Sequence, residues 1–169
     1  FIPLTVGGGI RNISDIKNEL VRVVLEYFNV SVPITVALNA DIPSYGSGLA
    51  SSSSFIISMI KAVSVFEKIE MSNYEIVELA LKLERKFNPL VGRQDPIGCG
   101  LIGFKHLYFD SNNEDYITPI NFKYFDEHNL FLIPISDTGR SSTDVLKSLD
   151  LKGRKSILEI VKDGVDCLS

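Results

Sequence analysis

The stretch DIPSYGSGLASSSS at residues 41–54 runs directly into the apolar stretch FIISMIKAVSVF at residues 55–66. Glycines at positions 46 and 48 allow backbone N–H groups to come close to a bound anion. The serines that follow lie where a helix would begin, and a helix N-terminus presents N–H groups and the positive end of its dipole. This combination is typical of a loop that binds phosphate.

The helix after the serines is predicted from the spacing of its apolar residues. Positions 55, 59, 62, 63 and 66 recur at intervals of three and four, and isoleucines at 56 and 60 broaden the stripe. We therefore expect a mostly buried helix over 55–66, with Ser51 or a neighbour as its N-cap. A capped helix with no ligand would explain one of the serines. The pattern alone leaves two interpretations open, an anion-binding loop and an ordinary capped loop.

The composition is that of a globular protein and gives no support to nucleic-acid or membrane binding. The chain has 169 residues, 45% hydrophobic and 22% charged, with a formal net charge of −4 and a calculated pI of 5.2. Nucleic-acid-binding proteins usually show a basic surface and a high pI, and no apolar run approaches the roughly 18–20 residues that span a bilayer. We therefore expect a cytoplasmic protein. Cys99 and Cys167 are far apart and lack nearby metal-ligand residues, so we expect free thiols.

Helices and strands interleave along the chain without a regular repeat, which favours an α+β domain. Apolar spacing and capping residues predict a helix at 14–28, a second from Ser72 or Asn73 to before 88, and closing helices at 143–149 and 156–167. Strands are predicted at 32–40, 104–110, 116–122 and 130–135, with a polar hairpin at 111–113. The segment 88–103 is expected to be a glycine-rich loop. The residues expected on buried helix faces are Ile16, Leu20, Val23, Val24 and Tyr27 in the first helix and Ile76, Leu79, Ala80 and Leu83 in the second.

Two acidic residues downstream of the serines are candidates for chemistry. Asp95 stands on a glycine-rich segment beside Arg93, and such a carboxylate can accept a proton from a substrate hydroxyl while the cation keeps it ionised. Asp before Pro is also a common start of a turn, and Asp95 precedes Pro96. Glu84 lies near the end of its helix, where most glutamates are solvated. Taken singly, each is better explained by an ordinary structural role.

Taken together, the serine loop, Glu84 and the GRQDP sequence around Asp95 resemble the motifs of the GHMP small-molecule kinases, which include galactose, homoserine, mevalonate and phosphomevalonate kinases. The loop resembles the second family motif, P-x-x-x-G-L-G-S-S, and the spacing from Glu84 to Asp95 resembles that in mevalonate kinase. The aspartate motif and the segment TGRSS at 138–142 are most similar to sugar kinases related to D-glycero-D-manno-heptose 7-phosphate kinase and fucose kinase. The resemblance covers roughly residues 13–150.

The resemblance implies transfer of the γ-phosphoryl group of ATP, with Mg²⁺, to a hydroxyl of a small sugar or sugar phosphate. The implied acceptor is D-glycero-D-manno-heptose 7-phosphate at its anomeric hydroxyl, for the synthesis of nucleotide-activated heptose and surface polysaccharide. By this resemblance Asp95 is catalytic and Ser52 and Glu84 hold Mg²⁺. The implied substrate-binding residues are Arg93, Gln94 and Arg140. The implied ATP-phosphate-binding residues are Gly46, Ser47, Gly48, Leu49, Ala50, Ser51 and Ser52.

The resemblance also implies a fold. Residues 1–150 would form the N-terminal domain of a GHMP kinase, of the ribosomal protein S5 domain 2 type, and 151–169 would begin a truncated, ferredoxin-like C-terminal domain. PLTVGGG at 3–9 resembles an incomplete first motif, so we expect a gap after residue 9. Ala50 replaces the usual glycine, which is unfavourable if its φ must be positive. Pro43 lies one residue farther from Gly46 than in most relatives, and Pro96 stands where a glutamine often follows the aspartate.

Two alternatives stay open. Ala50 and the altered first motif would also suit a kinase-like module that binds nucleotide or sugar without catalysis. The chain could instead belong to a fucose, galactose, homoserine or mevalonate-type branch. The homoserine branch lacks the catalytic aspartate, and mevalonate-type kinases favour P-S-G-x-D before it, which Gly92-Arg93-Gln94 does not match. A homodimer is likewise left open by the sequence.

Overall fold

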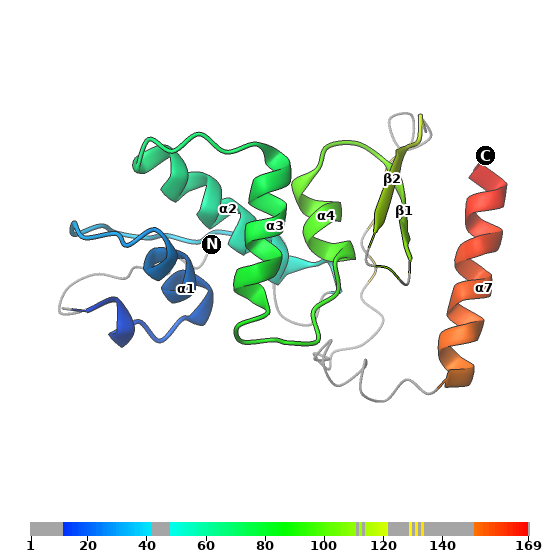
Figure 1. Cartoon of the computed structure of the whole chain (residues 1–169), viewed down its shortest axis with the longest axis horizontal. Coiled ribbons are helices and arrows are strands. Elements are labelled where there is room, and N and C mark those ends of the chain that lie inside the picture. The colour runs from blue at the N-terminus through cyan, green and yellow to red at the C-terminus, as the bar shows by residue number, and fades with distance from the viewer. Residues whose placement is uncertain are drawn as a thin grey trace. The chain divides into compact units, whose positions relative to one another are not determined.

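The computed structural model describes residues 12–41, 48–110, 112, 114–121, 129, 131, 133 and 151–168, which fall into two compact units (Figure 1). The first unit ends at Leu101 and the second begins at Ile102. The first motif at 3–9, the helix predicted at 143–149 and the domain boundary predicted at residue 150 lie outside the described residues, as does most of the strand predicted at 130–135.

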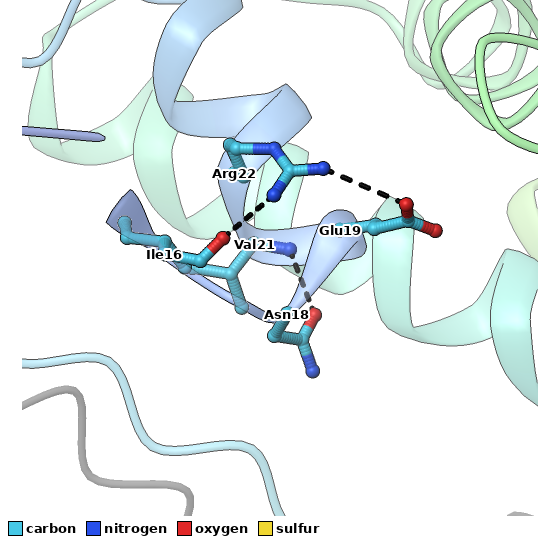
Figure 2. Close-up of polar contacts among 5 residues, drawn as sticks. All are labelled: Ile16, Asn18, Glu19, Val21 and Arg22. Atoms are coloured by element: carbon cyan, nitrogen blue, oxygen red, sulfur yellow. Dashed lines mark hydrogen bonds and ion pairs between the residues drawn. The ribbon is translucent and has the colours of Figure 1, made fainter. Parts of the chain in front are cut away.

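The first unit opens with a short 3-10 helix, η1 (Ile13–Asp15), followed by helix α1 (Glu19–Tyr27). Asn18 caps α1, because its side-chain oxygen accepts a hydrogen bond from the Val21 N–H at 3.1 Å (Figure 2). Arg22 reaches back across this start. Its guanidinium donates to the Ile16 carbonyl at 2.8 Å and lies 3.6 Å from the Glu19 carboxylate (Figure 2).

The helix predicted over 14–28 was therefore wrong at its N-terminal end. The Asn18 cap makes the chain turn before the regular helix begins at Glu19. Its buried residues are Val21, Val23, Val24 and Leu25. Tyr27, predicted to be buried, is 47% exposed.

Residues 32–40 were predicted to be a strand, and the structure corrects this. The segment contains no assigned strand, but its burial alternates as in a strand: Val36 is buried, Ile34 and Leu38 are half-buried, and the residues between them are exposed. A strand needs a hydrogen-bonded neighbour, and no other described segment pairs with this one. The alternating pattern therefore identifies the side chains that contact the core, but the segment forms no hydrogen-bonded ladder with a second strand.

Three helices form the part of the first unit that carries the candidate site. They are α2 (Ser51–Phe66), α3 (Asn73–Glu84) and α4 (Gln94–Gly100), and they pack against one another, with α1 also against α2 and α3 (Figure 1). The core includes the buried residues Val24, Ile56, Ile60, Val63, Ile76, Ala80 and Leu83. Phe66, predicted to be buried, is 53% exposed at the end of α2.

Helix α3 confirms the sequence prediction most fully. Ser72 is its N-cap, and Ser72 and Glu75 form a reciprocal capping box. The Ser72 backbone N–H and hydroxyl both donate to the Glu75 carboxylate, and these bonds lower the pKa of Glu75. All four residues predicted to be buried on this helix are buried: Ile76, Leu79, Ala80 and Leu83.

The segment predicted to be a glycine-rich loop, 88–103, contains helix α4 instead. Pro96 lies in its first turn, where its missing N–H breaks no intrahelical bond. Pro96, Ile97 and Gly100 are buried. Packing of these residues against α2 and α3 therefore overrides the low helix propensity of the two glycines in α4.

The second unit contains a two-stranded antiparallel sheet and one long helix. Strand β1 (Lys105–Phe109) pairs with β2 (Asp115–Pro119), with Leu107 opposite Ile117. This confirms the predicted hairpin, although β2 begins one residue earlier than predicted and ends before the predicted end at 122. Helix α7 (Leu151–Leu168) begins earlier than the predicted 156. Among the described residues, no helix has the length and hydrophobicity needed to cross a membrane.

Candidate active site

The candidate active site lies at the N-terminus of α2, where two serines bond to Glu84 at the C-terminal end of α3. Ser52 Oγ donates to Glu84 Oε1 at 2.5 Å, and Ser53 Oγ donates to Glu84 Oε2 at 2.7 Å. Both oxygens of one carboxylate are thus held by adjacent residues of one helical turn. The packing of α2 on α3 creates this cluster, because its members are far apart in the sequence.

Glu84 is the unusual member of the cluster, because a carboxylate rarely lies in a protein interior without a cation. Glu84 is 1% exposed and Ser53 is 0% exposed. In the part of the chain that the structure describes, no lysine, arginine or histidine forms an ion pair with Glu84. The two hydroxyls satisfy its hydrogen bonding, but neither of them carries a positive charge. The solvated glutamate suggested by sequence position alone is therefore wrong, and the arrangement suits a carboxylate that binds an external cation.

The serines at 51–54 form the first turn of α2, so the helix begins four residues before the predicted position 55. Its N-cap is Ala50, the residue before Ser51, and no side chain caps the helix. The Ser54 N–H bonds to the Ala50 carbonyl at 3.0 Å. Backbone N–H groups in the first turn of a helix point out of its N-terminus and attract anions. The start of α2 can therefore bind an anion beside the Ser52–Glu84 pair.

The backbone of the loop before α2 takes up the left-handed conformation twice. Gly48 has φ +69°, where glycine is unstrained. Ala50 has φ +52° and ψ +34°, which is unfavourable for a residue with a Cβ by about 1–2 kcal/mol. Position 50, for which the resemblance implies a glycine, thus has a positive φ in this chain.

We expect Ala50→Gly to raise the free energy of unfolding by about 0.5–1 kcal/mol, because relief of the left-handed strain exceeds the entropy that glycine adds to the unfolded chain. Urea denaturation of both proteins measures the change. Ala62→Gly is the matched control. Ala62 lies exposed in the middle of α2 in helical conformation, so its replacement should lower the free energy of unfolding by about 1 kcal/mol. If Ala50→Gly and Ala62→Gly lowered the free energy of unfolding equally, the backbone at Ala50 could not be strained.

Asp95 lies half-buried in the first turn of α4. Cys99 is four residues later, and residues four apart share a helix face. The Cys99 thiol donates to the Ala50 carbonyl at 3.8 Å, so this face of α4 is directed toward the start of α2. The face of α4 that Asp95 shares with Cys99 is therefore the face next to the start of α2.

The structure pairs Arg93 with a different carboxylate from the one expected from the sequence. Arg93 pairs with Glu78 of α3, with Nη2 2.8 Å from Oε1, and not with the Asp95 carboxylate. Gln94 is exposed as the first residue of α4. Three further predicted site residues, Gly46, Ser47 and Arg140, lie outside the described residues.

Ser53 is the residue of this cluster that the sequence analysis missed. Its position continues the buried stripe of α2, because Ser53, Ile56 and Ile60 follow one another at intervals of three and four. Glu84 continues the stripe of Val77 and Ala80 on α3 in the same way. Two polar residues on buried stripes need partners. The positions of Ser53 and Glu84 on buried stripes could therefore have predicted from the sequence that the two side chains bond to each other.

Comparison with known families agrees with this arrangement of helices and polar residues. Residues 16–101 match the model of the GHMP kinases N terminal domain, a stretch that includes α1 to α4 and the cluster around Glu84. The chain therefore belongs to the GHMP kinase family.

Part of the chain is also similar in sequence to a curated sugar-phosphate kinase. The chain is 30% identical over 103 residues to a D-glycero-alpha-D-manno-heptose 7-phosphate kinase of Campylobacter jejuni subsp. jejuni serotype O:2. The match covers 60% of this chain and 30% of the length of the relative.

Proposed function

We propose that the protein transfers the γ-phosphoryl group of ATP, with Mg²⁺, to a hydroxyl of a sugar phosphate, and that the acceptor is D-glycero-D-manno-heptose 7-phosphate at its anomeric hydroxyl. The observation that carries the proposal is Glu84, a buried carboxylate that two serines hold at the start of α2. Membership of the kinase family and the partial match to a heptose 7-phosphate kinase support it.

The chemistry of these residues fits Mg²⁺. Mg²⁺ prefers oxygen ligands and is usually held by one or two carboxylates together with substrate phosphates. Among the described residues there is no cluster of three or more acidic, histidine or cysteine side chains that could hold a metal by itself. Ser52 and Glu84 would therefore hold Mg²⁺ together with the nucleotide. When bound, the ion neutralises the charge on the phosphates.

The other residues of the site bind and orient the reactants. Backbone N–H groups from Gly46 to Ser52 would hold the β- and γ-phosphates at the positive end of α2. The Asp95 carboxylate would orient the acceptor hydroxyl and accept its proton as the hydroxyl oxygen bonds to the γ-phosphorus and the bond to ADP breaks. Gln94, and Arg140 from outside the described residues, would bind the sugar phosphate, as would Arg93 after exchange of its Glu78 partner.

The decisive experiment incubates the full-length protein with ATP, Mg²⁺ and each acceptor of a panel. The panel contains D-glycero-D-manno-heptose 7-phosphate, fucose, galactose and mevalonate. ADP release coupled to an absorbance assay measures turnover, and phosphorus-31 NMR identifies the phosphorylated position. We expect turnover with the heptose phosphate and a new anomeric phosphate signal. Turnover with another acceptor instead would assign the protein to the branch of the family that phosphorylates that acceptor.

The strained backbone at Ala50 favours one alternative, a kinase-like module that binds nucleotide or sugar without catalysis, because a strained loop is less easily held in the single geometry that positions a γ-phosphate for transfer. Calorimetric titration with ATP and with the heptose phosphate separates the two functions. Binding of either ligand together with no turnover on any acceptor would support the module and exclude the kinase.

A further inference from the structure

We propose that Ser53 is a positioning residue that fixes Glu84 for metal binding, whereas Ser52 is the partner that exchanges its contact when the metal and nucleotide bind. This inference rests on the proposed kinase function. Neither the family match nor the similarity to the Campylobacter kinase assigns a role to Ser53.

The two serines differ in burial, although both bond to the same carboxylate. Ser52 is exposed at the N-terminus of α2, so its hydroxyl can turn from Glu84 toward a bound ligand. Ser53 is fully buried, and its 2.7 Å bond to Glu84 Oε2 lies inside the protein. The Ser53 hydroxyl therefore has no route to a ligand and stays on Glu84 while Ser52 moves.

The Ser53 bond selects which oxygen of Glu84 a metal can use. Because the bond from Ser53 to Oε2 is buried and Ser52 is exposed, the oxygen available for exchange is Oε1, the one that Ser52 contacts. A second hydrogen bond that orients a ligating carboxylate typically raises metal affinity by about 10–100-fold.

The need for such orientation follows from how few ligands this site offers. Glu84 is the only carboxylate in the described serine cluster, and the remaining oxygens must come from Ser52, the nucleotide and water. A Mg²⁺ ion tolerates little deviation from octahedral geometry, so it would bind weakly if Glu84 were misdirected.

The test compares Ser53→Ala with Ser54→Ala in the full-length protein. Ser54 lies exposed in the same turn of α2, so its variant makes the same chemical change away from Glu84. Calorimetry measures ATP binding over a series of Mg²⁺ concentrations, with no acceptor present. We expect Ser53→Ala to raise, by about 10–100-fold, the Mg²⁺ concentration that gives half of the maximal increase in ATP affinity. ATP binding without Mg²⁺ should stay unchanged. Ser54→Ala should match the wild type in both.

Circular dichroism at the assay temperature establishes that each variant is folded. If Ser53→Ala is not, Ser53→Cys replaces it, since cysteine keeps the size and is a weak donor, and its Mg²⁺ requirement should fall between wild type and alanine. A role in stability alone would lower the melting temperature with no shift in the Mg²⁺ requirement, and that result would overturn the inference. If ATP binding by the wild-type protein did not depend on the Mg²⁺ concentration, both the proposed function and this inference would be overturned.

Discussion

Asp95→Asn is expected to lower kcat for sugar phosphorylation by about 10²–10⁴-fold, the usual contribution of a general base, while ATP binding stays within experimental error of the wild type. Asparagine has nearly the same shape as aspartate but cannot accept the proton of the acceptor hydroxyl at neutral pH. Steady-state kinetics with the heptose phosphate measure kcat, and calorimetry measures ATP affinity.

The structure supports this separation of turnover from binding and from stability. No ion pair in the described part of the chain involves Asp95, so the substitution breaks none. Asp95 shares a face of α4 with Cys99, whose thiol contacts the Ala50 carbonyl at the start of α2. We therefore expect the substitution to remove a group on the face of α4 next to the start of α2 and to cost the folded state little.

Glu70→Gln is the control for this prediction. It also replaces a carboxylate by an amide, but Glu70 is exposed between α2 and α3, beyond the C-terminal end of α2. We expect wild-type kcat from it. If Asp95→Asn retained wild-type kcat, Asp95 could not be the base, and the resemblance of the GRQDP segment to the catalytic motif would not extend to function.

Gly100→Ala is expected to lower the free energy of unfolding by about 1–3 kcal/mol, the usual effect of overpacking a core. A Cβ at Gly100 would lie 2.2 Å from Val77 Cγ2 and 3.4 Å from Ile57 Cδ1. Val77 is 1% exposed on α3 and has little room to move. The added methyl group must therefore push α4 away from α3.

Gly98→Ala tests the explanation within the same helix. A Cβ at Gly98 meets no atom within 4 Å, and the residue is exposed. Its substitution should raise the free energy of unfolding by about 0.5–1 kcal/mol, because alanine favours the helix. Chemical denaturation of the two variants should therefore give opposite signs. Loss of stability in both would show that α4 needs flexible glycines and would reject the steric explanation.

The Gly100 contact also matters for the proposed activity. Helix α3 carries Glu84 and α4 carries Asp95, so the close approach of Gly100 to Val77 sets the spacing between the two carboxylates. We expect folded Gly100→Ala protein to lose kcat, because a shift of about 1 Å in a catalytic group can reduce the rate by about 10²-fold. Restoring space with the additional change Val77→Ala should recover part of this loss.

Local signals explain which elements could be predicted from the sequence. Helix α3 was predicted with its cap and its buried face, because the Ser72 capping box and the apolar spacing both act within a few residues of the chain. The hairpin of β1 and β2 was predicted for a similar reason, since its strands are joined by a short polar turn. The strand predicted at 32–40 failed, because a strand depends on a partner that local periodicity does not supply.

The sequence by itself determined the family motifs and the helices whose hydrogen bonds join residues four positions apart. Through the family resemblance it also predicted site roles for Ser52, Glu84 and Asp95, although each was ambiguous alone. Only the tertiary structure decided that Glu84 is buried, that Ser53 holds its second oxygen, and that Ala50 takes a positive φ. These features depend on how α2, α3 and α4 pack, and packing joins residues that no local pattern connects.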